Sequence, residues 1–294
     1  MKKKIFLTGG TGFIGRNIIE LLSERYAIFA PSHKELDLTK QRDVDSCFKE
    51  QLFDVVLHCA IKPGHRNAKE LSGLLECNTR MFYNILKNRG KFGRLIYLGS
   101  GLVYGLNNYI PKMKESYCGT VIPEDESGFS KYIIAKQIET DKDMVELRPF
   151  GVFGKYEDYS IRFISNVICK CIMNIPITLK QNKRFDYVCI EDFIDIVEKM
   201  IEVGWKRSAY NITPDSTFEL LEIARLVMNI TGKKLPIKIE LNGFGREYSG
   251  DNSLLKSDFG FLKFTSLETS IRNLYTWYLE RIESIDRESL LVDK

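Results

Sequence analysis

Short apolar runs alternate with longer segments of helical spacing over the first half of the chain. Residues 4–8 form a compact apolar run that predicts a buried strand, and residues 13–23 carry apolar side chains close to helical spacing. The pattern repeats downstream, with a helix expected over about 67–88 and strands over 27–30, 54–58, 94–98 and 144–148. Strands that alternate with helices predict an α/β fold built on a doubly wound parallel sheet.

A glycine-rich turn, Thr8 to Gly15, lies between the first predicted strand and helix. Glycines in such a turn allow a tight reversal, a close approach of a pyrophosphate and close packing of the helix on the strand. The helix N-terminus adds free N–H groups and a favourable dipole. The turn therefore predicts a dinucleotide site, the alternative being a purely structural turn. Its expected contacts are Gly9, Gly12, Phe13, Ile14 and Gly15.

Several further positions follow predicted strands in the same way. Ligands of parallel sheets bind beyond the carboxyl ends of the strands. Gly9, Cys59, Ser100 and Pro149 each come after a strand, so we expect them to line one crevice.

Tyr132 and Lys136 stand four residues apart, which places them on one face of a predicted helix. A nearby cation favours a phenolate and lowers the tyrosine pKa from its usual value of about 10, which makes the phenol a better acid–base group. Taken alone, the pair also fits a solvated helix face. Its occurrence together with the glycine-rich turn favours a catalytic role.

Composition is that of a globular protein with one large or two modest domains, since 44% of the 294 residues are hydrophobic and 28% charged. No apolar run reaches the roughly 18 residues of a membrane span. The absence of a signal segment and of a disulfide framework among seven cysteines predicts a cytoplasmic protein. Cys169 and Cys171 lack a partner pair, so no metal site is expected. A net charge of +4 suits anionic small ligands and does not indicate nucleic acid.

The chain resembles the extended short-chain dehydrogenases/reductases, in the branch that modifies nucleotide-linked sugars. The resemblance runs from residue 4 to about residue 280 in the family's order. It rests on residues 8–15, Asp37-Leu38, His58 to Ala60, Asn78, Leu98 to Ser100 with Val103 to Gly105, Tyr132 with Lys136, residues 147–154, residues 184–188 with Asp192, and Tyr210 to Ile212. It implies a Rossmann-like domain and a smaller C-terminal α/β domain that holds a nucleoside diphosphate sugar.

The resemblance also implies domain limits. The cofactor domain covers 1–150 with later returns near 184–212, the substrate domain covers 151–183 and 213–265, and a C-terminal helix at 266–284 precedes a tail at 285–294.

In the family, the matching tyrosine is the acid–base group, the lysine binds the nicotinamide ribose, and the serine hydrogen-bonds the reacting sugar oxygen. The resemblance therefore assigns these three roles to Tyr132, Lys136 and Ser100. Asn78 either supports the helix geometry or a water near Lys136, or is a polar helix residue of no consequence. The remaining expected cofactor contacts are Ser32, His33, Lys34, Asp37, Leu38, Cys59, Ala60, Ile61, Asn78, Leu98, Pro149 and Val152.

The end of the second strand bears on the choice between NAD and NADP. NAD enzymes usually carry a carboxylate there for the ribose 2′-hydroxyl. Here Ser32, His33 and Lys34 follow, which suits a 2′-phosphate and predicts NADP(H), unless His33 and Lys34 form a merely exposed loop. Residues 35–39 resemble the same segment of GDP-fucose synthases and dTDP-4-dehydrorhamnose reductases. Both use reduced NADP-type cofactors, and Asp37 is then expected near the adenine.

Arginines are expected at the diphosphate of the sugar nucleotide, because a guanidinium is planar, charged and bidentate. The resemblance assigns this role to Arg184 and Arg246, whereas Arg162 fits a surface role equally well. The expected substrate contacts are Ser100, Gly101, Leu102, Tyr132, Arg162, Arg184 and Arg246.

Departures from the family narrow the reaction. Leu102 stands where GDP-fucose synthases carry a cysteine, and residues 155–159 contain no histidine, so a second acid–base pair for epimerisation is not visible. Gly101 and Leu102 also replace the acidic pair of dehydratases. The resemblance then implies NADPH-dependent reduction of a nucleotide-linked 4-keto-6-deoxy sugar, in deoxysugar biosynthesis for surface polysaccharide.

Two other functions stay open. One is a nucleotide-sugar 4-epimerase with tightly bound NAD, and the other is a non-catalytic NADP-sensing protein. A homodimer is left open as well, because the helix after Lys136 is short for the family's dimer interface.

Overall fold

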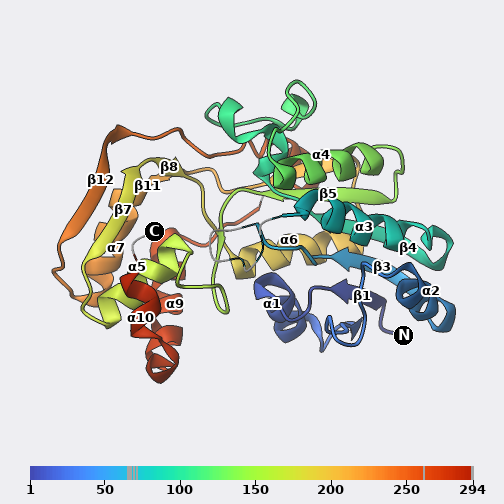
Figure 1. Cartoon of the computed structure of the whole chain (residues 1–294), viewed down its shortest axis with the longest axis horizontal. Coiled ribbons are helices and arrows are strands. Elements are labelled where there is room, and N and C mark those ends of the chain that lie inside the picture. Colours follow the sequence, from blue (N-terminus) through green and yellow to red (C-terminus); the bar gives the residue numbers. More distant parts are fainter. Residues whose placement is uncertain (65–67, 69, 71, 261, 293–294) are drawn as a thin grey trace.

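Six parallel strands form the central sheet, in the spatial order β10–β5–β4–β3–β1–β2 (Figure 1). The structure is a computed structural model that describes residues 1–64, 68, 70, 72–260 and 262–292. The chain runs outward from β1 to β2 and then returns to the other side of β1, which creates a switch point between β1 and β3. This confirms the Rossmann-like α/β prediction. The strands are β1 (Lys4–Thr8), β2 (Ala27–Phe29), β3 (Phe53–His58), β4 (Phe92–Leu98), β5 (Met144–Pro149) and β10 (Ala209–Ile212).

Side chains on the sheet alternate between two buried faces. Ile5 and Leu7 of β1 join one apolar cluster, whereas Phe6 joins the other, as the two-residue period of a strand requires. The first face is covered by α1 (Phe13–Leu22), α6 (Ile190–Val203) and α8 (Ser253–Phe259). The second is covered by α2 (Gln41–Glu50), α3 (Leu74–Leu86) and α4 (Glu126–Ile138).

Helix α3 is shorter than the 67–88 stretch predicted from the sequence. It begins at Leu74, directly after Gly73, whose φ of 67° is left-handed and cannot continue from a preceding helical turn. Residues 65–67, 69 and 71 lie outside the described residues, so the first part of that prediction concerns residues of which nothing is said.

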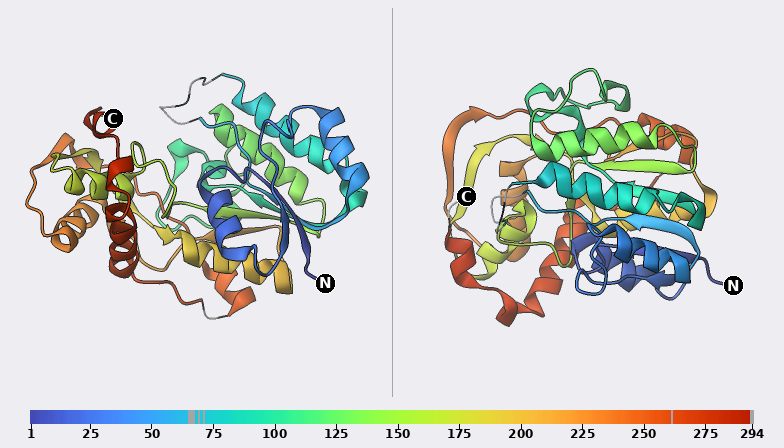
Figure 2. Two further views of the ribbon diagram at one scale, coloured as in Figure 1. Left: turned by 90° about the horizontal axis from the view of Figure 1, so that it is seen from below. Right: turned by 45° about the vertical axis from the view of Figure 1, so that its right-hand side comes forward.

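A second group of elements lies beside the sheet and has an apolar cluster of its own (Figures 1 and 2). Its two-stranded parallel sheet is flanked by four helices. The elements are α5 (Phe163–Ile172), β7 (Ile177–Asn182), α7 (Leu220–Thr231), β12 (Ile237–Phe244), α9 (Leu267–Leu279) and α10 (Arg287–Leu291). Two short strand pairs accompany them, β6 (Val152–Phe153) with β9 (Val188–Cys189) and β8 (Arg184–Phe185) with β11 (Phe218–Glu219). Five 3₁₀ turns are described: η1 (Arg89–Lys91), η2 (Gly101–Tyr104), η3 (Leu106–Asn108), η4 (Glu115–Tyr117) and η5 (Ile282–Ser284).

The packing around α8 differs from the predicted domain limits. Residues 213–265 were expected to serve the substrate, yet Leu255 of α8 is fully buried in the same cluster as the central sheet. The chain therefore returns to the sheet once more after β12.

Helix α1 ties the two groups of elements together. Its Glu20 accepts hydrogen bonds from Lys155 Nζ at 2.6 Å and Tyr156 Oη at 2.7 Å. The Arg16 guanidinium lies 3.9 Å from the centre of the Tyr156 ring, which in turn meets the edge of Trp277 in α9. The helix that follows the glycine-rich turn thus also contacts the second group.

Among the described residues, no helix combines the length and apolar character needed to cross a bilayer.

Phe193 of α6 offers a test of this core. It is 1% exposed, so Phe193→Ala is expected to lower the free energy of unfolding by about 3–5 kcal/mol in urea denaturation. Val203 at the end of the same helix is 66% exposed, and Val203→Ala is expected to cost about 0.5 kcal/mol or less. Equal losses for the two variants would contradict the burial of α6 against the sheet.

Candidate active site

The glycine-rich turn is shaped by close backbone contacts. Gly9 has a φ of 73°, and a Cβ there would lie 2.8 Å from the backbone nitrogen of Ala60. A Cβ at Gly15 would lie 2.2 Å from the carbonyl oxygen of Gly9. Only glycine fits at both positions, so α1 presses directly on the turn, which lies against the end of β3.

The N-terminus of α1 is suited to an anion. Gly12 precedes the helix, donates its N–H to Gly9 O at 3.0 Å, and supplies no side-chain cap. No acidic residue stands in the first helical turn, which contains Phe13 and Ile14. The free N–H groups and positive dipole end are therefore available to a phosphate.

A cavity of about 280 Å³ opens against this turn. It collects predicted cofactor residues from three separate strand ends, which fits the dinucleotide prediction. Its lining comprises Phe6, Thr8, Gly9, Thr11, Gly12, Pro31, His33, Leu36, Leu38, Cys59, Ala60, Ile61 and Met81.

The turn after β2 contains a carboxylate that the sequence prediction did not place there. Glu35 folds back so that its Oε2 accepts the Ser32 N–H at 2.7 Å, and this bond lowers the pKa of Glu35. Glu35 does not line the cavity. Lys34 is exposed beside His33, and Asp37 turns away from the cavity to accept hydrogen bonds from Thr39.

The other predicted cofactor residues surround the strand ends without lining this cavity. Asn78 is 4% exposed, and its Oδ1 accepts the Lys62 N–H at 2.8 Å, so it anchors the segment that follows β3. Leu98 and Pro149 end β4 and β5. Val152 lies in β6 and pairs with Val188.

Ser100 lies where β4 gives way to η2. Its Oγ accepts the N–H of Leu102 at 3.2 Å, which leaves the hydroxyl proton free for another acceptor. The turn packs on α4, because Gly128 has no Cβ and allows the Leu102 carbonyl to approach. The neighbouring Gly101 is buried, and its carbonyl accepts a hydrogen bond from the Tyr109 hydroxyl.

Tyr132 and Lys136 occupy one face of α4, as predicted. The ammonium of Lys136 lies 5.8 Å from the centre of the Tyr132 ring. It also forms an ion pair with Glu139 at 2.9 Å, and the hydrogen bonds to Glu139 raise the pKa of Lys136. Lys136 is therefore a cation at neutral pH, next to a phenol, on a helix that packs against the turn that carries Ser100.

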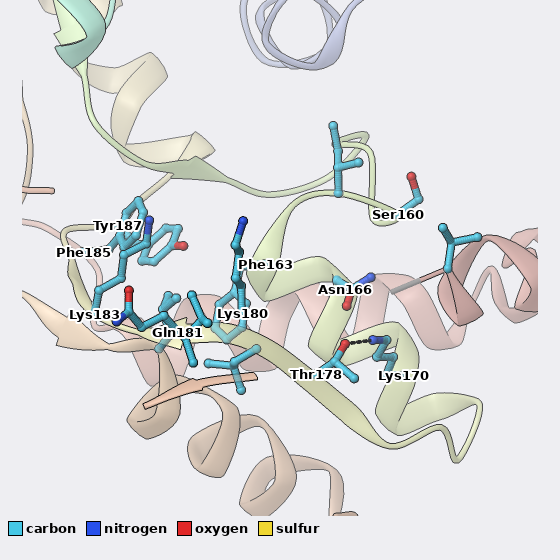
Figure 3. A pocket seen from close by; sticks show the side chains of 15 residues that line it. Ser160, Phe163, Asn166, Lys170, Thr178, Lys180, Gln181, Lys183, Phe185 and Tyr187 are labelled. Atoms are coloured by element: carbon cyan, nitrogen blue, oxygen red, sulfur yellow. Dashed lines mark hydrogen bonds between the residues drawn. The ribbon is translucent and has the colours of Figure 1, made fainter. Parts of the chain in front are cut away.

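A second, larger cavity of about 510 Å³ lies in the group of elements beside the sheet (Figure 3). Figure 3 shows Lys183, Phe185 and Tyr187 on one side, and Asn166, Lys170 and Thr178 on the other, with Lys180 between them. Lys170 is buried and donates to Thr178 Oγ1 at 2.7 Å. Burial, and then the charge of Lys180, lower the pKa of Lys183. Three lysines and aromatic rings together suit a phosphorylated ligand with a planar base.

Lys183 and Arg184 are neighbours in sequence but differ in their surroundings. Lys183, Phe185 and Tyr187 line the cavity, whereas Arg184 is not among its lining residues and pairs with Glu219 at 3.2 Å. The arginine predicted to bind the diphosphate is therefore not among the cavity residues, and the lysine before it is.

The other two predicted arginines also lie outside the cavity. Arg162 is exposed at the N-terminus of α5, one residue before the cavity-lining Phe163. Arg246 donates to the carbonyls of Leu106 and Asn107, so it touches the segment that follows η2.

Aromatic side chains connect the second cavity with the Ser100 turn. Phe185 contacts Tyr187 at 5.5 Å and Tyr248 at 5.4 Å between ring centres. Tyr248 contacts Tyr109 at 4.7 Å, and its hydroxyl approaches the Cα of Gly101 so closely that a Cβ there would lie 2.8 Å away. The aromatic contacts thus run from the wall of this cavity to the turn that carries Ser100.

The comparisons with known proteins agree with this architecture. Residues 5–213 match the NAD dependent epimerase/dehydratase family. The chain belongs to this family. The resemblance to extended short-chain dehydrogenases/reductases is thereby confirmed.

Relatives in this family cover nearly the whole chain. A GDP-6-deoxy-D-talose 4-dehydrogenase from Aggregatibacter actinomycetemcomitans is 26% identical over 92% of this chain and 97% of its own length. A GDP-L-fucose synthase from Azorhizobium caulinodans is 25% identical over 94% and 96%, respectively. The GDP-mannoheptose C4 reductase from Campylobacter jejuni, solved with NADP bound, superimposes with a TM-score of 0.81 at 22% identity, covering 95% of this chain and 98% of that one.

Proposed function

We propose that the protein reduces the 4-keto group of a nucleotide-linked 6-deoxy sugar with NADPH. The observation that carries this proposal is that Tyr132 and Lys136 share one face of α4, and that α4 packs against the turn carrying Ser100, whose hydroxyl can still donate. The relatives named for GDP-linked sugars favour guanosine diphosphate as the nucleotide.

The side chains have complementary tasks in such a reduction. A bound reduced nicotinamide supplies the hydride. Tyr132 gives its phenolic proton to the oxygen that becomes the alcohol, and Ser100 donates a hydrogen bond to the same oxygen. Lys136, as a fixed cation, favours loss of that proton from the phenol and binds the cofactor ribose.

NADPH is favoured over NADH by the turn after β2. His33 lines the first cavity, Lys34 is its exposed neighbour, and no carboxylate is among the residues that line the cavity. Glu35 partly opposes the preference for NADPH, because its carboxylate lies at this turn and already accepts the Ser32 N–H. NADP in the heptose reductase supports the same choice.

The second cavity is assigned to the nucleoside diphosphate. Lys183 and Lys180 supply positive charge, and Phe185 and Tyr187 offer flat apolar surfaces to the rest of the nucleotide. The sugar then extends along Tyr248 toward Ser100. The same proposal makes the elements around this cavity the substrate-binding part.

A 4-epimerase with tightly held NAD uses the same tyrosine, lysine and serine, and is the second candidate. A sensor without activity is disfavoured, because Tyr132 and Lys136 are both present. Incubation with a 4-keto sugar nucleotide separates the candidates, since a reductase consumes NADPH stoichiometrically.

Tyr132→Phe removes only the phenolic hydroxyl. It is expected to lower kcat by about 10²–10⁴-fold, the usual contribution of a positioned proton donor, while NADPH affinity barely changes. Stopped-flow loss of NADPH absorbance measures the first quantity and fluorescence titration the second. If the protein instead inverts C4 of a 4-hydroxy sugar nucleotide without net NADPH consumption, it is an epimerase and the reductase proposal is wrong.

Lys34→Glu tests cofactor choice. The native protein is expected to bind NADPH at least about tenfold more tightly than NADH, which corresponds to about 1.4 kcal/mol, and Lys34→Glu is expected to erase most of that ratio by repelling the 2′-phosphate. Lys91→Glu makes the same charge change at the exposed last residue of η1 and serves as the control. Equal affinities in the native protein would refute the NADP assignment.

Lys183→Met and Arg184→Met form a matched pair of neighbouring cation deletions. Lys183→Met is expected to raise the KM for the sugar nucleotide by about tenfold or more, because a half-buried cation that contacts a phosphate is lost. Arg184→Met is expected to raise it far less, because that side chain faces Glu219. Steady-state kinetics at saturating NADPH give both values. A larger effect at Arg184 would move the diphosphate to the opposite face of the strand.

A further inference from the structure

A row of polar side chains crosses one face of the central sheet near its carboxyl end. The strand register aligns Thr8 with His58, His58 with Tyr97, and Tyr97 with Glu146. These four residues are at most 4% exposed. Apolar residues fill the rest of this face, so the row is a polar layer directly beneath the crevice.

His58 is the neutral member of the row. Its Nδ1 lies 2.7 Å from the Thr8 hydroxyl, and that oxygen accepts the Ala60 N–H at 3.2 Å, so the hydroxyl proton is available to Nδ1. Burial, and then the charge of Lys131, lower the pKa of His58 to about 3. The imidazole therefore carries no charge at neutral pH.

Lys131 lies over this row from α4 and is buried, with 3% exposed. Its ammonium is 5.5 Å from the centre of the Tyr97 ring. A lysine buried to this extent loses most of its hydration, which is costly unless an opposite charge lies near. The nearby opposite charge belongs to Glu146, which acts to raise the pKa of Lys131.

Glu146 links Lys131 to the Ser100 turn. Its Oε2 forms an ion pair with Arg148 at 2.7 Å, and both side chains are buried. Its Oε1 accepts no hydrogen bond from the described residues and lies against Gly99, where a Cβ would be 2.1 Å away. The backbone that delivers Ser100 thus rests on a carboxylate that is paired with Arg148 and also interacts electrostatically with Lys131.

Among the described residues, further charged groups act on Arg148 and Glu146. Arg148 also donates to the Tyr104 hydroxyl at 3.1 Å, and the carboxyl of Glu115 in η4 faces Arg148. Glu139 of α4 acts on Glu146 from a distance and is paired with Lys136. With His58 neutral, Glu146 has one negative charge to balance both Lys131 and Arg148.

We propose that Lys131 is a positioning residue of the reaction, whose buried positive charge, held by Glu146 under Gly99, stabilises negative charge that develops beside Tyr132 and Ser100. Lys131 directly precedes Tyr132 in α4, and Glu146 lies against Gly99, the residue before Ser100, so the pair lies beneath the two elements that carry these groups. The proposal rests on the proposed reduction. A role in stability alone would not explain these buried charges, because buried ions are often no more stabilising than apolar side chains of the same volume.

The charge on Lys131 is expected to disappear within the working pH range. Burial lowers its pKa to about 8, with partial compensation by Glu146. Below pH 8 the ammonium is protonated and the rate is at its plateau. Above pH 8 the proton is lost, so kcat is expected to fall.

The experiment compares kcat between pH 6 and pH 10 for the native protein, Lys131→Arg, Lys131→Met and the control Lys142→Met, an exposed lysine just beyond α4. Lys131→Met is expected to be about tenfold slower at pH 7 and to lack the fall near pH 8, with the KM for NADPH unchanged. Lys131→Arg keeps a cation at all these pH values and is expected to retain its rate above pH 9. Lys142→Met is expected to match the native profile.

A second readout needs no substrate. In protein labelled with ¹³C at the lysine Cε, the Lys131 signal is identified by its absence in Lys131→Met, and it is expected to titrate near pH 8. Glu146→Gln is expected to lower that midpoint by about one unit, because the compensating charge is lost. Thermal unfolding checks that each variant is folded, and Lys131→Met leaves the ion pair of Glu146 and Arg148 intact.

The outcomes are separable. If the native protein is active and Lys131→Met has the same pH profile, the role of Lys131 is overturned and the reductase proposal stands. The same conclusion follows if the Lys131 signal titrates with the exposed lysines. A native protein that consumes no NADPH with 4-keto sugar nucleotides overturns the proposed function, and the role of Lys131 with it.

Discussion

The close approach of the glycine-rich turn to the end of β3 is the constraint on which the site depends. Gly9 lies against the backbone of Cys59 and Ala60, and Gly15 lies against Gly9, so two strands and one helix meet with no side chain between them. This contact aims the N-terminus of α1 at the first cavity. Since α1 also holds Lys155 and Tyr156 through Glu20, the helix that would receive the cofactor phosphates sets the position of the second group of elements as well.

The two cavities and the residues between them form one functional layout. The first lies at the switch point of the sheet, where parallel folds bind their ligands, and the second lies in a separate apolar cluster. The aromatic contacts from Tyr187 through Tyr248 run from the wall of the second cavity to Gly101, next to Ser100. Under the proposed function, the chemistry belongs to the sheet and α4, whereas the nucleotide contacts belong to the neighbouring group.

Much of this layout was predictable, because local patterns determine it. Apolar runs identified five strands of the sheet, and the glycine spacing identified the turn. The assignment of Arg162, Arg184 and Arg246 to the diphosphate stays a prediction. None of the three lines the second cavity, and which side chains of a segment line a cavity is not visible from one motif. The electrostatic interaction between Lys131 and Glu146 could not be inferred, since they belong to different elements that approach each other only when α4 packs on the sheet. Likewise, the hydrogen bond between Ser32 and Glu35 depends on a turn geometry that composition alone does not specify.

Lys183 and Arg184 are adjacent in sequence, yet only the lysine of the two lines the second cavity. A strand exchanges its two faces when it slips by one residue. A single-codon insertion or deletion just before Lys183 would therefore change which side chains line this cavity without substituting any residue, while the central sheet and α4 stay unaltered.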